Sequence, residues 1–345
     1  MLTEAAERGT ITAYEIGTAL ALLFFARQKV DIAVLEIGLG GRLDAVNAVT
    51  PLVSVITSLS LDHMAVLGNT IEQIAFEKAG IIKPGVPVLT VPQWPAALPV
   101  LQEIAAERGT TLQVVEPAHL AGDNLRPGPE FRHLSSQRLQ IKYGPQEIET
   151  DLPLLGEHQR LNAALAAAVV WEQQQRPGGL AVPPAAVTKG FAQVWWPARL
   201  QLLEDRRGQP LVVADGAHNA ESAARLREAL AENFYYEKLW LAVGIYADKD
   251  IAGILRELAS APKLAGIIFT RSHSPRAAEP SALIEAARPI LGDKPIVVEQ
   301  APNVPAVVKQ AQRLAGPLDL IVLTGSLSVA AEAEELLSRK PIVKH

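Results

Sequence analysis

The chain has 345 residues, of which 49% are hydrophobic and 20% charged. It contains no cysteine, which excludes a disulfide framework, a thiolate metal site and a cysteine nucleophile. The 32 basic and 37 acidic residues give a net charge of −5 without a basic block, so we expect small-molecule partners and no nucleic acid.

Short runs rich in Val, Ile and Leu alternate with longer segments of helical period, which predicts an α/β fold with a mostly parallel sheet. The predicted strands are 32–36, 52–57, 86–90, 211–214, 238–243, 266–270, 295–298 and 318–323. The predicted helices are 12–28, 71–79, 95–107, 160–171, 220–232, 250–258, 280–287, 304–314 and 328–337.

Two places break this alternation. Around 138–152, two alternating segments flank Gly144 and Pro145 and predict a hairpin. After the Pro- and Gly-rich stretch 176–184 and Pro197, a new series of βα units begins. We therefore predict two domains, 1–196 and 197–345.

The first predicted helix carries an apolar stripe that includes Ile16, Leu20 and Phe24 and needs a sheet to cover. No strand precedes it, so the first domain is expected to begin in the middle of a βαβ unit. The apolar run 19–26 is much shorter than the roughly 20 residues of a membrane span, and residues 1–10 do not resemble a secretory signal. These features predict a soluble, cytoplasmic protein without a membrane partner.

Polar residues follow the first two predicted strands. Glu36 is followed by three glycines, then by Arg42 and Asp44, and His63 follows the second strand. The glycines permit a sharp turn, but their spacing is not that of a dinucleotide fingerprint. A carboxylate and an imidazole at two strand ends can share one Mg²⁺. The alternatives are a plain turn with a surface pair of Arg42 and Asp44, and a structural histidine.

Lys78 lies on the apolar face of the predicted helix 71–79. Thr70 and Gln73 form a capping box at its start, and Gly80 ends it. Burial lowers the pKa of an unpaired lysine, and a neutral amine can react. The alternative is that Lys78 reaches solvent or pairs with a carboxylate at the helix end.

In the second half, Asp215, His218 and Asn219 follow strand 211–214 and directly precede a helix. Such groups can face a ribose or a phosphate, because a helix N-terminus favours anions. The alternative is a helix cap made by Asn219. The polar stretches 246–250, 272–276 and 324–326 also follow strands, and each can instead be a solvated turn.

Taken in order, several runs resemble the folylpolyglutamate synthase and dihydrofolate synthase family of the Mur ligase superfamily. They are LEIGLGGRLDAVN at 35–47, DH at 62–63, LGNTI at 67–71, EKAGIIKP at 77–84, LGEHQRLN at 155–162, PARLQ at 197–201 and DGAHN at 215–219. The resemblance implies a P-loop-type Mur ligase central domain, incomplete here, followed by a Rossmann-like α/β C-terminal domain. It also implies that Glu36 and His63 bind Mg²⁺ and that Lys78 is carbamylated near the metal.

For the nucleotide, the resemblance implies that Asn162 contacts adenine, Arg199 the ATP phosphates and Asp215 the ribose. His218 and Ser326 would lie near the incoming glutamate or the transferred phosphate. The implied reaction is ATP-dependent addition of L-glutamate to the γ-carboxylate of a reduced folate through an acyl phosphate, with Mg²⁺ neutralising phosphate charge. Dihydropteroate would be a further substrate if the enzyme is bifunctional. The family leads us to expect a monomer.

The sequence departs from the family pattern in two respects. No G-x-x-x-x-G-K-[ST] motif occurs, and this loop normally holds the ATP phosphates. In the family the loop lies upstream of the run at 35–47, so we expect roughly one hundred further residues there and an inactive chain without them. The second departure is Ala198, where the family usually has glycine.

Two other functions are compatible with these motifs. One is another Mur-type amide ligase that acts on a cell-wall nucleotide peptide, against which the runs at 36–47 and 77–84 argue. The other is a catalytically inactive protein that binds folate, glutamate or adenine, which the missing phosphate loop favours. Release of ADP distinguishes the two enzyme readings from the binding protein.

Overall fold

The computed structural model describes residues 11–62, 64–121 and 127–337. They form two compact units. The first consists of the described residues up to Ala118, Ile141–Glu147 and Leu161–Val187, and the second of the described residues in His119–Gln140, Ile148–Arg160 and from Thr188 onward. The predicted α/β class is confirmed by the parallel sheets of both units.

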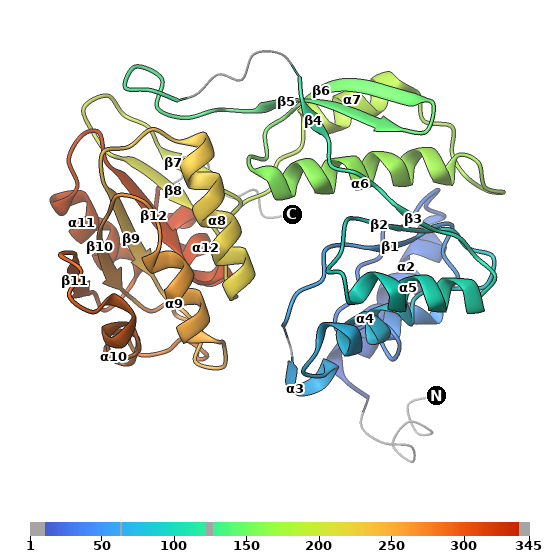
Figure 1. The fold of residues 1–345 in the computed structure, drawn as a ribbon, viewed down its shortest axis with the longest axis horizontal. Helices are drawn as coiled ribbons and strands as arrows, with labels where there is room; N and C mark the ends of the chain where they lie inside the picture. Colours follow the sequence, from blue (N-terminus) through green and yellow to red (C-terminus); the bar gives the residue numbers. More distant parts are fainter. Residues whose placement is uncertain (1–10, 63, 122–126, 338–345) are drawn as a thin grey trace. The chain divides into compact units, whose positions relative to one another are not determined.

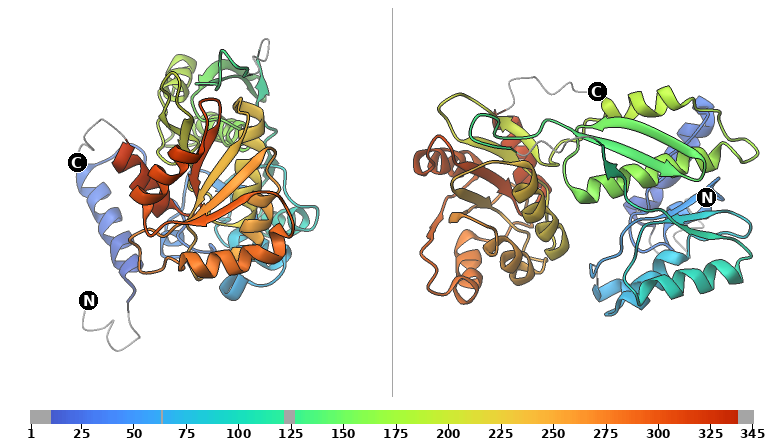
Figure 2. Two further views of the ribbon diagram at one scale, coloured as in Figure 1. Left: turned by 90° about the vertical axis from the view of Figure 1, so that its left-hand side faces the viewer. Right: turned by 45° about the horizontal axis from the view of Figure 1, so that its top comes forward.

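The second unit is built on a six-stranded sheet in the order β11-β10-β9-β12-β8-β7 (Figures 1 and 2). All neighbours are parallel except β7, which is antiparallel to β8. The strands are β7 (Gln201–Glu204), β8 (Leu211–Ala214), β9 (Leu239–Val243), β10 (Leu264–Phe269), β11 (Val297–Gln300) and β12 (Leu320–Thr324). Except for β7, each contains or overlaps a predicted strand.

Helices cover both faces of this sheet (Figure 1). Along β9, Leu239 and Leu241 pack with α8, α9 and α10, whereas Trp240 and Ala242 pack with α11 and α12. This alternation buries the strand on both sides, as expected for parallel strands made almost entirely of apolar residues. The helices are α8 (Ala220–Asn233), α9 (Ile251–Ala259), α10 (Pro280–Leu291), α11 (Val304–Leu314) and α12 (Leu327–Leu337).

The first unit contains a parallel sheet in the order β1-β2-β3. Its strands β1 (Ser54–Ile56), β2 (Val88–Thr90) and β3 (Leu112–Val114) pack with α4 (Ile71–Ala79) and α5 (Ala97–Glu107) in one apolar cluster. The predicted capping box of α4 is confirmed, with Thr70 as N-cap and Gln73 as its partner. Short helices η1 (Ala45–Ala48) and α3 (Met64–Leu67) precede α4.

Helix α2 (Ala13–Gln28) forms as predicted, with a capping box between Thr12 and Glu15, but none of its residues is buried. The predicted strand 32–36 is wrong, because these residues have no strand conformation and Val34 is 93% exposed. A β-strand needs a neighbour for its backbone hydrogen bonds. Among the described residues, no strand pairs with 32–36, so an apolar sequence alone does not make it a strand.

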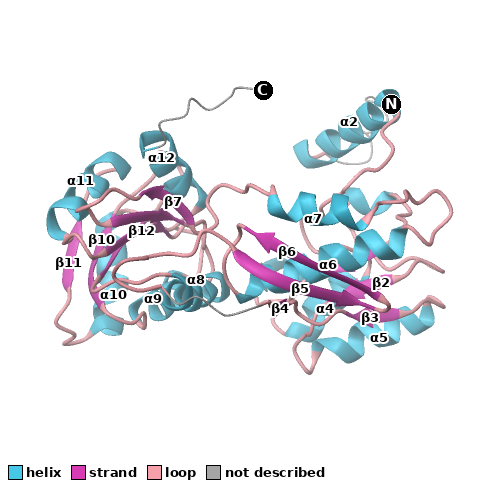
Figure 3. Cartoon of the chain, turned by 90° about the horizontal axis from the view of Figure 1, so that it is seen from above, coloured by secondary structure: helices cyan, strands magenta, loops and turns pink. Residues whose placement is uncertain are grey.

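The predicted hairpin is confirmed by β5 (Gln137–Tyr143) and β6 (Gln146–Leu152), which form a sheet in the order β4-β5-β6 with β4 (His119–Leu120). Figure 3 shows the hairpin beside α6 (Glu157–Gln173). Helix α7 (Pro184–Ala192) was not predicted, because proline at its start resembles a loop signal, although proline is well tolerated in a first helical turn.

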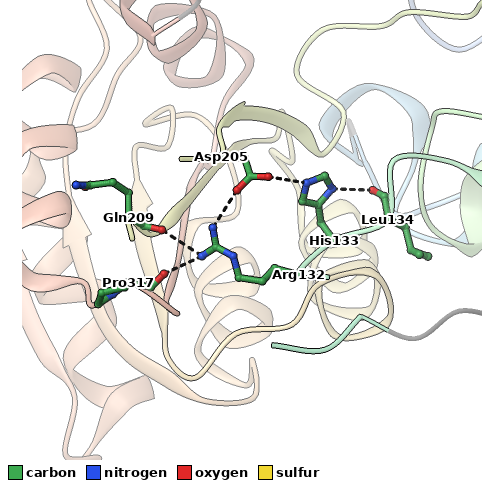
Figure 4. Close-up of polar contacts among 6 residues, drawn as sticks. All are labelled: Arg132, His133, Leu134, Asp205, Gln209 and Pro317. Atoms are coloured by element: carbon green, nitrogen blue, oxygen red, sulfur yellow. Dashed lines mark hydrogen bonds and ion pairs between the residues drawn. The ribbon is translucent and has the colours of Figure 1, made fainter. Parts of the chain in front are cut away.

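Within the second unit, Arg132 and His133 tie a short segment before β5 to residues 205–209 and to Pro317 (Figure 4). Arg132 donates to the carbonyl oxygens of Gln209 and Pro317, at 3.1 and 2.7 Å, and to Asp205 Oδ1 at 2.9 Å. His133 Nε2 lies 3.2 Å from Asp205 Oδ2. One guanidinium therefore joins the segment of Asp205 and Gln209 to Pro317, which lies more than one hundred residues further along the chain. In the described part of the chain, no helix is both long and apolar enough to cross a membrane.

Candidate functional site

The carboxyl ends of β8, β9 and β12 lie side by side at one edge of the second sheet, because the three strands are parallel neighbours. Ligands of open α/β sheets bind at this edge. Asp215 follows β8, Gly244 follows β9, and Gly325 and Ser326 follow β12. A Cβ atom on Gly325 would lie 2.8 Å from the carbonyl oxygen of Gly244, so only glycine permits this close approach of the two turns.

The Asp215 carboxylate is fixed by the backbone. Oδ2 accepts a hydrogen bond from the Leu200 amide at 3.0 Å, and Oδ1 accepts one from the Ala217 amide at 2.9 Å. Burial raises the pKa of Asp215 above its usual value, and the two amide donors and the nearby Arg199 and His218 oppose this rise. Asp215 thus connects the turn after β8 to the loop that carries Arg199.

The loop of Arg199 has an unusual backbone. Ala198 and Leu200 have φ values of 55° and 44°, in the left-handed region that costs an L-residue roughly 1–2 kcal/mol. The resemblance leads us to expect glycine at Ala198, and this geometry favours glycine there. A Cβ on Gly216 would lie 3.0 Å from Arg199 Nη1, so the guanidinium lies directly against the turn after β8.

His218 stands immediately before α8. Its Nδ1 lies 2.8 Å from the Gly216 carbonyl oxygen, which can only accept, so Nδ1 carries the proton in the neutral ring and Nε2 carries the lone pair. Asn219 is the N-cap of α8 and accepts from the Ser222 amide at 2.8 Å. The alternative reading of Asn219 as a cap is therefore confirmed, and it leaves the His218 ring outside the cap.

Ser326 is 1% exposed and lies just before α12. Its Oγ accepts from the Val329 amide at 3.3 Å, so it caps this helix. Within the described part of the chain, the buried hydroxyls of Thr270, Ser272 and Thr324 have no hydrogen-bond partner. The three residues follow or end β10 and β12 and are at most 3% exposed, and a buried polar group without a partner is costly.

Sequence reasoning missed His158, in the first turn of α6. Burial, and to a smaller extent the neighbouring guanidinium groups of Arg225, Arg199 and Arg160, together lower the pKa of His158 to about 4. Two of these arginines are paired with carboxylates, Arg160 with Glu232 and Arg225 with Glu228, and the neutral imidazole lies among these pairs and Arg199. The run LGEHQRLN did contain His158, but only the fold brings Arg199 and Arg225 to it.

In the first unit, the glycine-rich loop after Glu36 packs on the end of α4. Asp44 Oδ2 accepts from the amides of Gly38 and Leu39, each at 3.0 Å. A Cβ on Gly41 would lie 2.8 Å from the Glu77 carbonyl oxygen, which explains a glycine at that position.

Arg42 leaves this loop and binds Glu77, with Nη2 2.9 Å from Oε1. The alternative of a surface pair between Arg42 and Asp44 is therefore wrong. Asp44 is engaged by backbone amides, while the arginine ties the loop to the helix that carries Lys78.

Lys78 is partly buried on the same side of α4 as Ile71 and Ala75. Burial lowers the pKa of Lys78, and the nearby Asp62 carboxylate opposes this shift. Glu36 is exposed, and the predicted ligand His63 lies outside the described residues. No group of three or more His, Asp or Glu side chains suited to a metal occurs among the residues that the structure describes.

Asn162 lies in α6 with an exposed side chain, and it belongs to the first unit, like Glu36 and Lys78. The structure thus brings Arg199, Asp215 and His218 together in the second unit, with Ser326 at the same edge of the sheet. The first unit carries the other residues that the resemblance implies, namely the metal ligands, the lysine and the adenine contact.

Comparison with protein families gives the class of the molecule. Residues 3–170 match the Mur ligase middle domain, and residues 198–327 match the glutamate ligase domain of Mur ligases. Together with the polar edge of the second sheet, these matches define an ATP-dependent ligase of the Mur type.

Individual relatives narrow this class. The dihydrofolate synthase/folylpolyglutamate synthase of Bacillus subtilis is 33% identical over 96% of this chain and 73% of its own length. The folylpolyglutamate synthase of Lacticaseibacillus casei is 34% identical over 95% of this chain and 72% of its own. The chain belongs to the folylpolyglutamate synthase/dihydrofolate synthase family, and by this homology it is an ATP-dependent glutamate ligase of folate metabolism.

Solved structures agree. Mycobacterium tuberculosis folylpolyglutamate synthase, complexed with ADP and AMPPCP, superimposes with a TM-score of 0.82 at 31% identity and covers 99% of this chain and 76% of its own. An Escherichia coli structure in complex with DHPP and ADP superimposes with a TM-score of 0.78 at 28% identity, covering 94% of this chain and 71% of its own.

Proposed function

We propose that this chain carries the residues that transfer the terminal phosphate of ATP to the γ-carboxylate of a reduced folate and join L-glutamate to the resulting acyl phosphate. Dihydropteroate is proposed as a second acceptor, because relatives named for both activities align over 95–96% of the chain. The observation that carries the proposal is the polar edge of the second sheet, where Arg199, Asp215 and His218 converge.

Nucleotide binding is assigned to three side chains. Asp215 is held as an acceptor, which suits a ribose hydroxyl, and Arg199 can pair with a phosphate. Asn162 is proposed to contact adenine. The proximity of the Arg199 guanidinium to the neutral His158 ring supports an anionic ligand on the second unit. ADP in the Mycobacterium tuberculosis and Escherichia coli structures supports a nucleotide as that ligand.

His218 is proposed to act on the incoming amine. Its Nε2 lone pair can accept the proton that the α-ammonium group of glutamate must lose before it attacks the acyl phosphate. Ser326 and the unpartnered hydroxyls of Thr270 and Thr324 are proposed to bind the glutamate carboxylates. Exclusion of water from this edge protects the acyl phosphate from hydrolysis.

Mg²⁺ is proposed as a cofactor, with Glu36 and His63 as ligands. A carboxylate is a donor that Mg²⁺ prefers, and the ion keeps several water and phosphate ligands, so few protein groups are needed. The positively charged Lys78 ammonium would repel Mg²⁺, whereas a carbamylated Lys78 would carry a negative charge. Carbamylation requires the neutral amine, and the lowered pKa of Lys78 favours that form. When bound, the ion neutralises charge on the phosphate oxygens.

The same proposal includes a division into two domains at residue 197, a monomeric state and a cytoplasmic location.

The 345 residues contain no G-x-x-x-x-G-K-[ST] motif, so we propose that this chain alone binds ATP weakly and does not catalyse the ligation. A protein that only binds folate or nucleotide is the second candidate, and the missing motif is the observation that favours it.

The test is ADP release with tetrahydrofolate and L-glutamate, measured on the native protein isolated from its own cells. We expect glutamate-dependent ADP release from the native protein and none from the 345-residue chain alone, and we expect His218→Gln to lower the native activity by about 10²–10⁴-fold with little change in nucleotide affinity. A Lys249→Gln variant on a nearby turn is the matched control. Nucleotide binding without ADP release under these conditions would instead establish the binding protein.

A further inference from the structure

A cavity of about 620 Å³ opens beside the tip of the β5–β6 hairpin, within the first unit. Its wall comes from the hairpin, the end of α6 and β3, and includes Gln113, Tyr143, Gln146, Trp171, Glu172 and Gln174. The volume lies in the range of small-molecule sites. None of these residues has a role in the proposed ligase reaction.

Two aromatic rings form one side of the cavity. Tyr143 and Trp171 are nearly parallel, with their ring planes 13° apart and their centroids separated by 6.4 Å. Trp171 is only 4% exposed, so it packs against the Tyr143 ring and offers little surface of its own. Tyr143 therefore supplies most of the aromatic surface of the cavity.

The polar side of the cavity accepts hydrogen bonds and carries negative charge. Among the residues that the structure describes, Glu172 is the only charged one that lines it, and the other polar groups are glutamine amides and the Tyr143 hydroxyl. That hydroxyl lies 2.5 Å from Gln113 Oε1 and 3.2 Å from Glu172 Oε2. Burial and Glu172 raise the pKa of Tyr143 to about 12, so the phenol keeps its proton.

A second hollow of about 340 Å³ continues from the first and shares Gln146, Trp171 and Gln174 with it. Its remaining wall is largely apolar and includes Ala181, Val182 and Pro184. The combined site therefore has a charged, aromatic end and an apolar extension.

We propose that this hairpin pocket, defined by the residues named above, binds a small organic cation with an apolar body. An ammonium, amidinium or guanidinium head would pair with Glu172, donate to the glutamine oxygens and contact the Tyr143 ring. The apolar body would lie along Val182 and Pro184. Phosphates and carboxylates are unsuited to it, since no cationic side chain among the described residues lines either hollow.

The test is calorimetric titration of the full chain with benzamidine, a planar amidinium on an apolar ring, alongside neutral benzamide and anionic benzoate. We expect benzamidine to bind about tenfold or more tightly than benzamide, and benzoate not to bind. Absence of benzamidine binding, or equal binding of the three compounds, would overturn the proposal.

Variants locate the binding. Glu172→Gln should weaken benzamidine binding about tenfold, whereas Glu147→Gln, which removes an exposed carboxylate paired with Lys142 on the same hairpin, should leave it unchanged. Ala181→Arg should weaken binding and Ala181→Glu should strengthen it, and this exposed position makes both variants tolerable to the fold. Equal effects of Glu172→Gln and Glu147→Gln, or no difference between the two Ala181 variants, would contradict the assignment.

Discussion

Two turns with the same sequence pattern behave differently in this molecule. Both follow an apolar run and begin with a carboxylate, Glu36 in the first unit and Asp215 in the second. Strand β8 is buried between β12 and β7, and two backbone amides hold Asp215. Segment 32–36 has no strand neighbour among the described residues, and both Val34 and Glu36 are exposed. The comparison shows that neighbouring strands and loops hold such a carboxylate in place. An apolar run followed by a carboxylate does not by itself provide these neighbours.

The largest expected effect tests how differently the two regions are packed. Leu241→Ala, in the fully buried strand β9, should lower the free energy of unfolding by about 2–5 kcal/mol. Leu20→Ala, at a residue of α2 that is 61% exposed, should change it by less than about 0.5 kcal/mol. Urea unfolding followed by circular dichroism measures both. A large cost for Leu20→Ala would show that this face of α2 is covered in solution.

The charge around the second site gives a pH-dependent prediction. The pKa of His158 is about 4 in the folded protein and 6.5 as an ordinary value, so between these pH values the unfolded chain binds the proton and the folded chain does not. Stability should therefore be lost as the pH falls from about 6.5 to 4, by up to about 3 kcal/mol.

His158→Gln should remove this part of the pH dependence. The measurement is the urea midpoint of both proteins from pH 7.5 to 4.5, where the two curves should converge or cross as the pH falls. Parallel curves would contradict the assignment of a neutral, desolvated imidazole.

A third prediction concerns how much the contacts of Arg132 with Asp205, Gln209 and Pro317 contribute to the stability of the second unit. Arg132→Met should cost about 1.5–3 kcal/mol, because it leaves a carboxylate and two carbonyls without their charged donor. Arg138→Met is the matched control, since Arg138 pairs with Glu149 at an exposed site and such pairs contribute under about 1 kcal/mol. Equal unfolding midpoints for the two variants would refute a structural role for the Arg132 contacts.

The smallest expected effect concerns the strained loop of the second site. Ala198→Gly should raise the free energy of unfolding by about 0.5–1 kcal/mol, because glycine adopts a φ of 55° without the clash of a Cβ atom. The change is measured by thermal unfolding, with Ala181→Gly as a control at an exposed position. A loss of stability at Ala198 would mean that the methyl group, which is 6% exposed, contributes more by packing than the backbone strain costs.

The sequence by itself determined the elements that depend on local chemistry. The apolar run 211–214 became β8, the capping box of Thr70 and Gln73 starts α4, and Gly144–Pro145 forms the turn of the hairpin. The short strand β7 and helix α7 escaped prediction, because β7 is paired only through tertiary contact and the start of α7 resembles a loop. Conversely, the apolar segment 32–36 was predicted as a strand, but no described strand pairs with it.

For the site, the sequence located Asp215, His218 and Lys78 from strand ends and a helix face, and the family resemblance supplied Arg199 and Asn162. Only the tertiary structure decided which of them meet, and it added His158, whose neighbours Arg199 and Arg225 lie more than forty residues away in the chain. The physical reason is that hydrogen bonding and periodicity act over a few residues, whereas burial and the summed field of several charges depend on segments that only the folded chain brings together.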